Sequence, residues 1–300
     1  MNSTITLPRH LPWYLLARIE SWITRPFKSK LDRDCPVCCG PTATRHMGLV
    51  SPTSYNVRGI GPKHFDLVCC CECNLVFLSP LPPEKAFEAL YIRFPQFTGH
   101  PAYHGESARM ALQFYRDRLA EISDVLAAGR KFERVLDIGS GLSLIALAAK
   151  LLDHRTIAVA QDISREAAEL CPWVDHYLVG PLESMEEEIQ ELGPFDLISM
   201  THVIEHLPNP VQVLRLCADW LSERGTIFVT APSRPVGWND SSPFEMWKNW
   251  EYNHTPAHLQ YFNGTSMRQC CLRSGLNLLK YEPDKDSFVA WLGSESKKPA

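Results

Sequence analysis

The feature that most constrains the fold is a regular alternation of short apolar segments and amphipathic segments from residue 132 onward. Short apolar segments bounded by turn residues are typical of strands, whereas the wider apolar spacing between them is typical of helices. Strands that alternate with helices form a parallel sheet covered on both faces, and ligands bind at the carboxyl ends of its strands. We therefore predict a doubly wound α/β sheet of seven strands that ends in an antiparallel hairpin. The expected strands are 134–138, 156–160, 176–179, 195–200, 226–230, 278–281 and 287–292, and the expected helices are 142–152, 164–171, 183–192, 210–222 and 265–274.

A glycine-containing turn follows the first expected strand and opens the first helix. It reads Asp137-Ile-Gly139-Ser-Gly141-Leu-Ser143. Glycines at this place let a ligand approach the backbone closely. A dinucleotide-binding turn would have a third glycine at position 144, which is leucine here, so a diphosphate ligand is disfavoured. Asp162 ends the second strand, where a carboxylate can accept both ribose hydroxyls, and the pattern predicts an adenosine ligand.

The cysteines are concentrated near the start of the chain, with seven of the eleven between residues 35 and 73. Two Cys-x-x-Cys pairs stand there, and two such pairs complete a closed tetrahedral site of four thiolates, which is typical of structural zinc. Three further thiols flank the pairs, and those beside the second pair should point away from the ion if the segment is extended. The expected zinc ligands are Cys35, Cys38, Cys70 and Cys73, and the flanking thiols are Cys39, Cys69 and Cys71.

Four regions are expected along the 300 residues. A basic, amphipathic segment (1–30) precedes a zinc-ribbon-like module (31–83), a helical linker or lid (84–130) and the ligand-binding domain (131–300). The first segment should dock on its own domain or on a second subunit, with peripheral membrane contact through 11–27 as the alternative. No apolar stretch is long enough to span a bilayer and no secretory signal is evident, so the chain is expected in the cytoplasm.

Seven motifs give the chain a family resemblance. They are CPVC at 35–38, CCECNLVFLSPLPP at 70–83, VLDIGSG at 135–141, AQDIS at 160–164, FDLISMTHVIEHLPNP at 195–210, LSERGTIFVTAPS at 221–233 and HLQYFNGTSMRQCC at 258–271. With these motifs the chain resembles the Rossmann-like (class I) S-adenosylmethionine-dependent methyltransferases, in the branch preceded by a cysteine-rich domain. The resemblance implies a seven-stranded methyltransferase sheet and S-adenosylmethionine as cofactor.

The resemblance also implies cofactor contacts. Asp137, Gly139 and Gly141 would hold the methionine moiety of the cofactor, and Asp162 would hold its ribose. The chain departs from the family at Ser143, where a third glycine is usual, and at Pro181, where an adenine-binding aspartate is usual. Contacts from Leu182 or Glu183 would substitute for that aspartate. The remaining expected cofactor-binding residues are Ser140, Ile163 and Thr201.

Three titratable residues follow the fourth strand: His202, Glu205 and His206. On a helix their spacing would place them on one face beside the reacting methyl group. One histidine could act as a general base, oriented by the carboxylate. Alternatively, the three could bind a divalent metal, since related quinone O-methyltransferases are similar in using an acidic and histidine cluster here. A purely structural role in the turn is the third reading.

The expected function is methyl transfer to a small-molecule acceptor, most readily to oxygen, in secondary or sugar-related metabolism. Aromatic residues between 238 and 252 follow the fifth strand and are expected either to cover the acceptor or to pack as a lid or dimer contact. An RNA-modifying methyltransferase is the alternative, but a net charge of −4 argues against a nucleic-acid partner. An inactive cofactor-binding protein and a homodimer are also left open.

Overall fold

The computed structural model describes residues 33–40, 42–53, 59–87, 89–90, 105–126 and 132–294 of the chain. The amphipathic segment expected over 1–30, and with it the membrane contact through 11–27, lies outside the described residues. Among the described residues, no helix is both long enough and apolar enough to cross a membrane.

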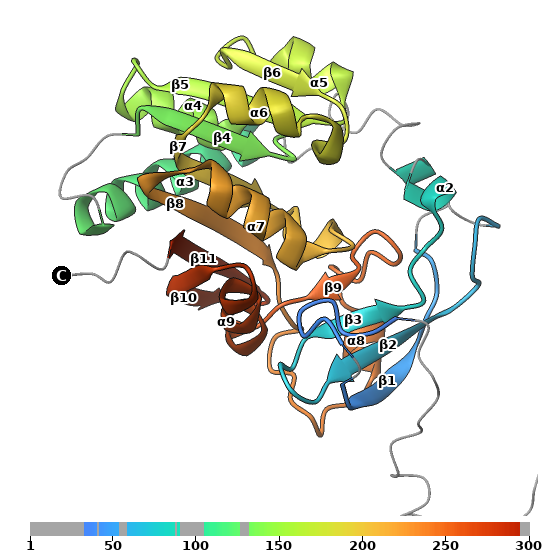
Figure 1. The fold of residues 1–300 in the computed structure, drawn as a ribbon. Helices are drawn as coiled ribbons and strands as arrows, with labels where there is room; N and C mark the ends of the chain where they lie inside the picture. The colour runs from blue at the N-terminus through green and yellow to red at the C-terminus, as the bar shows by residue number, and fades with distance from the viewer. Residues whose placement is uncertain are drawn as a thin grey trace, which may run out of the picture.

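A seven-stranded sheet forms the larger part of the molecule (Figure 1). Its strand order is β10-β11-β8-β7-β4-β5-β6, and β4 pairs in parallel with both β5 and β7. The last two strands form an antiparallel hairpin whose β11 pairs with β8. This confirms the predicted doubly wound sheet and its closing hairpin. The strands are β4 (Arg134–Ile138), β5 (Ile157–Asp162), β6 (His176–Val179), β7 (Phe195–Thr201), β8 (Leu221–Pro232), β10 (Leu276–Asp284) and β11 (Ser287–Ser294).

Helices cover both faces of this sheet. Because side chains alternate along a strand, neighbours such as Val135 and Leu136 enter different cores. One core contains side chains of α3 and α4, and the other contains side chains of α6, α7 and α9. The helices are α3 (Gly105–Leu126), α4 (Leu144–Leu152), α5 (Arg165–Leu170), α6 (Glu186–Leu192), α7 (Pro210–Trp220) and α9 (Gly264–Arg273), with single 3-10 turns η4 (Leu182–Ser184) and η5 (Ile204–His206).

A second, antiparallel sheet is built from two distant stretches of the chain (Figure 1). Its order is β1-β2-β3-β9, with β1 (Thr44–Val50), β2 (Phe65–Cys70) and β3 (Val76–Ser79) from the cysteine-rich region, followed along the chain by the short helix α2 (Glu84–Phe87). The two-residue strand β9 (Gln260–Tyr261) comes from the segment that precedes α9. The expected boundary at residue 83 therefore follows three of the four strands of the smaller sheet. The fourth strand, β9, comes from far beyond that boundary.

The aromatic segment between 238 and 252 packs on this second sheet. Trp247, on the short helix α8 (Glu245–Lys248), is fully buried in one cluster with β1–β3 residues such as Phe65, and Trp250 packs against the same cluster. The ring of Phe244 lies so close to Gly48 that a Cβ added there would meet it at 2.4 Å. These rings therefore pack on the second sheet of the chain itself.

Candidate functional site

The glycine turn between β4 and α4 has a left-handed backbone, and Asp137 of the preceding strand accepts hydrogen bonds from two serine hydroxyls. Gly139, Gly141 and Ser143 have φ values of 59°, 48° and 47°. A left-handed backbone is unfavourable for serine. At Ser143 this cost is offset by a hydrogen bond from its hydroxyl to Oδ2 of the buried Asp137, at 2.9 Å. Ser199 on β7 donates to the other carboxylate oxygen at 2.6 Å. Burial raises the pKa of Asp137 to about 7, although both hydroxyls act in the opposite direction.

Asp162 at the end of β5 closes the other side of the turn. Its carboxylate accepts hydrogen bonds from the backbone N–H of Gly141 and of Ser164, each at 2.8 Å. Burial raises its pKa, and these N–H donors oppose the shift. Asp162 therefore lies within one hydrogen bond of the glycine turn.

Two residues that the sequence analysis did not single out complete this end of the sheet. The Tyr177 hydroxyl on β6 donates to the carbonyl of Gly141 at 2.8 Å and accepts from Ser140 Oγ at 3.0 Å. Gln161 accepts from the N–H of Gly139 and donates to the carbonyl of Gly180 at 2.7 Å. Gln161 has a signal in the sequence, because it is the next-to-last residue of β5. Tyr177 is the second residue of β6 and pairs with Ala160, so only the pairing of the two strands brings it to the turn.

The other expected cofactor residues lie along the same edge. Thr201 is the last residue of β7, and Ile163 directly follows β5. Leu182 opens η4 after β6, and its side chain belongs to the core, which leaves its backbone as the group available to a ligand. Pro181 precedes that turn with φ of −57°.

The segment after β7 lies directly against the glycine turn. A Cβ added to Gly139 would meet a Val203 methyl group at 2.6 Å, so this glycine is required for the close approach. His202 has a left-handed φ of 56° and is followed by the 3-10 turn η5 rather than by the helix considered from the spacing. The two segments together place the histidine-containing loop beside the expected cofactor site.

Glu205 is a fully buried carboxylate surrounded by histidines. Its Oε1 lies 3.4 Å from His202 Nδ1 and 3.9 Å from His206 Nε2, while neither oxygen has a donor in hydrogen-bonding geometry among the described residues. Burial acts to raise the pKa of Glu205, but the neighbouring imidazoles outweigh it and hold the pKa at about 2. Burial acts to lower the pKa of His202, and the carboxylate reverses this, so the pKa of His202 is raised. Glu205 is thus an anion that favours the imidazolium form of His202.

His206 and His258 form an edge-to-face pair with ring centroids 4.8 Å apart. Nδ1 of His206 lies 2.9 Å from the carbonyl of Ala257, and Nδ1 of His258 lies 2.8 Å from the carbonyl of Tyr252. Since a carbonyl can only accept, both rings carry their proton on Nδ1 and present Nε2 as a lone pair when neutral. Burial, with His206 as a further cause, lowers the pKa of His258 to about 3. His258 joins the loop from 52 residues away in sequence, and the spacing of the first three residues gave no sign of it.

Four of the predicted thiols come together in the second sheet. Cys35 and Cys73 lie with their sulfurs 3.6 Å apart, Cys38 and Cys70 with theirs 3.8 Å apart, and all four sulfurs are within 4.8 Å of one another. Cys69 is buried in the aromatic cluster on the other face of β2. The remaining flanking thiols, Cys39 and Cys71, are exposed. The four thiols that cluster are thus those of the two Cys-x-x-Cys pairs, Cys35, Cys38, Cys70 and Cys73.

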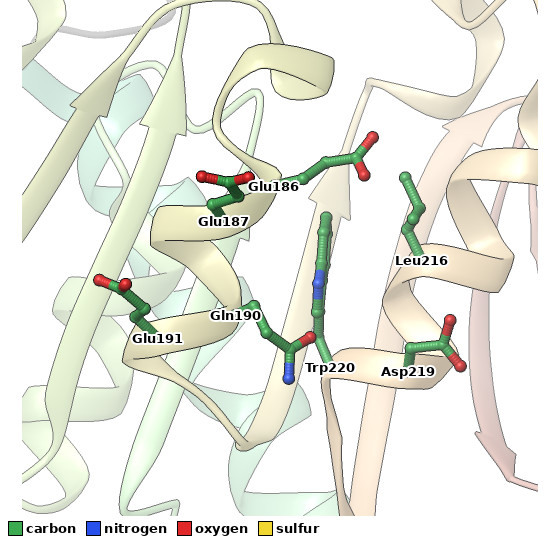
Figure 2. A pocket seen from close by; sticks show the side chains of 7 residues that line it. All are labelled: Glu186, Glu187, Gln190, Glu191, Leu216, Asp219 and Trp220. Atoms are coloured by element: carbon green, nitrogen blue, oxygen red, sulfur yellow. The ribbon is translucent and has the colours of Figure 1, made fainter.

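A cavity of about 440 Å³ lies elsewhere, between α6 and α7. Figure 2 shows the carboxylates of Glu186, Glu187 and Asp219 around the flat ring of Trp220. It is built from helices that cover one face of the sheet and shares no lining residue with the glycine turn or the histidine loop.

The sheet order, the glycine turn after β4 and the carboxylate after β5 together define a class I methyltransferase fold. Residues 108–281, more than half of the chain, match the methyltransferase domain family. The chain belongs to this family, which confirms the methyltransferase part of the resemblance inferred from its motifs.

Individual relatives cover less of the chain. A ubiquinone biosynthesis O-methyltransferase of Xanthomonas campestris is 32% identical over 107 residues, which are 34% of this chain and 44% of that protein. A protein of the same name from Shewanella halifaxensis is 24% identical over 118 residues, 38% of this chain and 49% of its own. Among solved structures, an S-adenosylmethionine-dependent methyltransferase from Clostridium acetobutylicum has a TM-score of 0.44 and 11% identity, covering 61% of this chain and 92% of its own. The chain thus spans about half the length of the curated relatives that it matches.

Proposed function

We propose that this protein transfers the methyl group of S-adenosylmethionine to an oxygen of a small-molecule acceptor. The observation that carries the proposal is the contact between Gly139 of the glycine turn and Val203 of the histidine loop, which joins a cofactor-binding element to a cluster of titratable groups. The name of the curated relatives supports oxygen as the acceptor atom. An acceptor from secondary or sugar-related metabolism remains part of the proposal.

The residues around the glycine turn fit the cofactor. S-adenosylmethionine, when bound, supplies a methyl group already activated by its sulfonium, so the protein contributes mainly binding and alignment. Asp137 offers a carboxylate to the amino group of a methionine moiety, and Asp162 offers one to ribose hydroxyls. The proposed cofactor contacts are completed by Gly139, Ser140, Gly141, Ile163, Leu182 and Thr201.

His206 is the proposed general base. Its Nδ1–H is committed to the carbonyl of Ala257, so Nε2 is the nitrogen that can take a proton from an acceptor hydroxyl. His202 is less suited to this role, because the adjacent Glu205 carboxylate keeps its proton in place. Glu205 would then act by orienting and stabilising the loop rather than by contacting the acceptor.

A second mechanism uses the same loop to hold a divalent metal. The donor atoms of Glu205, His206 and His258 lie within 4.8 Å of one another. Two imidazoles and a carboxylate are a set that binds zinc with an open position for a substrate oxygen. This set replaces His202 of the sequence-based hypothesis with His258. This mechanism would be favoured over the base if turnover required added divalent metal and if His258→Ala no longer responded to that metal.

The four thiolates fit a structural zinc ion. Zinc–sulfur bonds of about 2.3 Å in a tetrahedron place sulfurs about 3.8 Å apart. The two pairs at 3.6 and 3.8 Å agree with that spacing before any ion is considered. Because four protein ligands leave no open position, we propose that this zinc stabilises the small sheet and takes no part in methyl transfer.

Calorimetry with S-adenosylmethionine and S-adenosylhomocysteine tests the first step of the proposal. Binding of either at micromolar concentration is expected, and binding of neither would overturn it. A panel of catechols, quinols and hydroxylated sugars, assayed by release of S-adenosylhomocysteine, then tests the acceptor class. His206→Ala should lower turnover at least about a hundredfold with cofactor affinity unchanged, the range found for a general base. His254→Ala is the matched control, because the His254 ring packs edge-to-face on His258, with centroids 4.9 Å apart, and has no proposed role in proton transfer.

A further inference from the structure

The backbone that carries the proposed base accepts hydrogen bonds from β9 and from Arg33. Strand β9 pairs with β3 of the four-thiol region 31–83, which is called the thiolate module below, and Arg33 belongs to that module. Residues 204–208 present four carbonyls toward β9 and the start of the described chain. Gln260 Nε2 donates to the carbonyls of Ile204 and Leu207, at 2.9 and 2.7 Å. The N–H of Leu259 donates to the carbonyl of Glu205 at 2.8 Å. The fourth carbonyl, that of Pro208, accepts from Arg33 at 3.0 Å.

Arg33 and Gln260 form one buried unit. Arg33 Nη2 donates to Gln260 Oε1 at 3.1 Å, and its Nη1 reaches the carbonyls of Leu78 and Leu259. Both side chains are buried, and Gln260 is completely so. A buried amide whose oxygen faces a guanidinium has its amide hydrogens directed to the opposite side, and here that side is the loop. The orientation of Gln260 is therefore fixed by Arg33.

Each member of this unit is connected to one of the two Cys-x-x-Cys pairs, which are called knuckles below. Arg33 lies two residues before Cys35 in the sequence. Gln260 pairs with Phe77 on β3, and that strand begins three residues after Cys73. The two knuckles are thus the elements that place the guanidinium and the partner strand of Gln260.

We infer that Arg33 and Gln260 are positioning residues, through which the thiolate module sets the conformation of the loop that bears Glu205 and His206. The inference rests on the proposed function in one respect, namely that this loop carries the general base. It assigns the module a role in active-site geometry in addition to its role in stability. Neither residue touches cofactor or acceptor in this scheme.

Hydrogen exchange of the full chain, followed by mass spectrometry, tests the inference without an acceptor. Gln260→Glu keeps the side chain's shape and its acceptor for Arg33 but replaces the two donors with an oxygen. Loss of two buried hydrogen bonds should speed exchange of the backbone amides within 202–208, of which Pro208 has none, about ten- to thirtyfold. Asn263→Asp is the matched control, because it removes a hydrogen bond to the module at Asn74 that does not touch this loop. Its exchange in 202–208 should stay within about twofold of the parent.

A second variant and a second readout keep the test decisive. Gln260→Met removes the same donors without adding charge and should show the same local acceleration if the glutamate variant does not fold. Nitrogen-15 spectra of His206 should show loss of the single Nδ1–H tautomer in both Gln260 variants, a change that general destabilisation of a distant element would not produce. Unchanged exchange and an unchanged tautomer would overturn the inference.

Removal of the metal completes the design. Treatment of the parent protein with a chelator should accelerate exchange in 202–208 together with the knuckles, while β4 and β7 stay protected. Equal protection of 202–208 before and after treatment would refute the coupling. Failure of the proposed methyltransferase activity is a separate outcome, because exchange is measured without cofactor or acceptor.

Discussion

The carboxylate of Glu205 lies 3.4 Å from Nδ1 of His202, which joins a fully buried anion to a half-exposed imidazole. Desolvation of the ring acts to lower the pKa of His202, and the carboxylate outweighs it, so the pKa is raised. The direction of this shift therefore depends on a single neighbouring charge.

Glu205→Gln should remove the upward shift at His202. Without the carboxylate, the group that raises the pKa of His202 is gone, and this pKa should fall toward its ordinary value of about 6.5. Titration of the histidine ring signals by NMR measures this directly. Glu183→Gln, at an exposed carboxylate on η4, serves as the control and should leave the titration of His202 as it is in the parent. A pKa of His202 that stays raised in Glu205→Gln would show that another group supplies the charge.

Asp137→Asn should stabilise the free protein more at high pH than at low pH. The folded-state pKa of Asp137 is about 7, above its ordinary value, so folding favours the protonated carboxyl. Its stabilising contribution is complete below about pH 4 and is lost as the pH rises through 7. The asparagine has no such loss. Urea denaturation at pH 5 and pH 8 should show a difference on the order of 1–3 kcal/mol in favour of the variant at pH 8.

The control for this prediction is Asp284→Asn, at an exposed carboxylate on the closing hairpin. Its effect on stability should be small and similar at the two pH values. The same Asp137→Asn variant should weaken affinity for S-adenosylhomocysteine at least about tenfold, since it removes the proposed partner of the amino group. Stability profiles that run parallel for parent and variant would contradict the assignment of a raised pKa.

Periodicity accounts for what could be predicted of the fold. Strands such as His176–Val179 carry their own pattern, and their alternation with helices leaves little choice of topology. By contrast, β9 has two residues, too few to show a period, so its return to the cysteine-rich sheet was invisible in the sequence. For the same reason, the packing of the aromatic residues between 238 and 252 on the second sheet cannot be predicted from the sequence.

The residues of the candidate site likewise fall into those that local motifs indicate and those that pairing of distant segments brings in. Gly141 and Asp162 stand in local motifs and are joined by a hydrogen bond, and the four thiols of the two Cys-x-x-Cys pairs form a cluster of their own. His258 and Tyr177 reach the site through pairing of distant segments, and neither lies in a spaced motif with its partners. Contacts of that kind follow from tertiary packing and cannot be derived from local pattern.

Cys70→Ser should release the proposed zinc ion, whereas Cys71→Ser should not. The two residues are adjacent, but Cys70 is one of the four clustered thiols and Cys71 is exposed outside the cluster. Elemental analysis should find about one zinc per chain in the parent and in Cys71→Ser, and close to none in Cys70→Ser. The melting temperature should fall only in Cys70→Ser, because metal binding is coupled to folding. Zinc retained by Cys70→Ser would remove this thiol from the ligand set.

Gly48→Ala should destabilise the protein through the ring of Phe244. The added methyl group would lie 2.4 Å from that ring, and overpacking of this kind costs about 1–3 kcal/mol. Gly40→Ala is the control, because its added methyl group would meet no atom within 4 Å and should change stability by less than about 0.5 kcal/mol. Phe244→Leu in the Gly48→Ala background should recover part of the loss, since the smaller side chain can yield. Equal costs for the two glycine variants in thermal denaturation would mean that the ring does not occupy this position in solution.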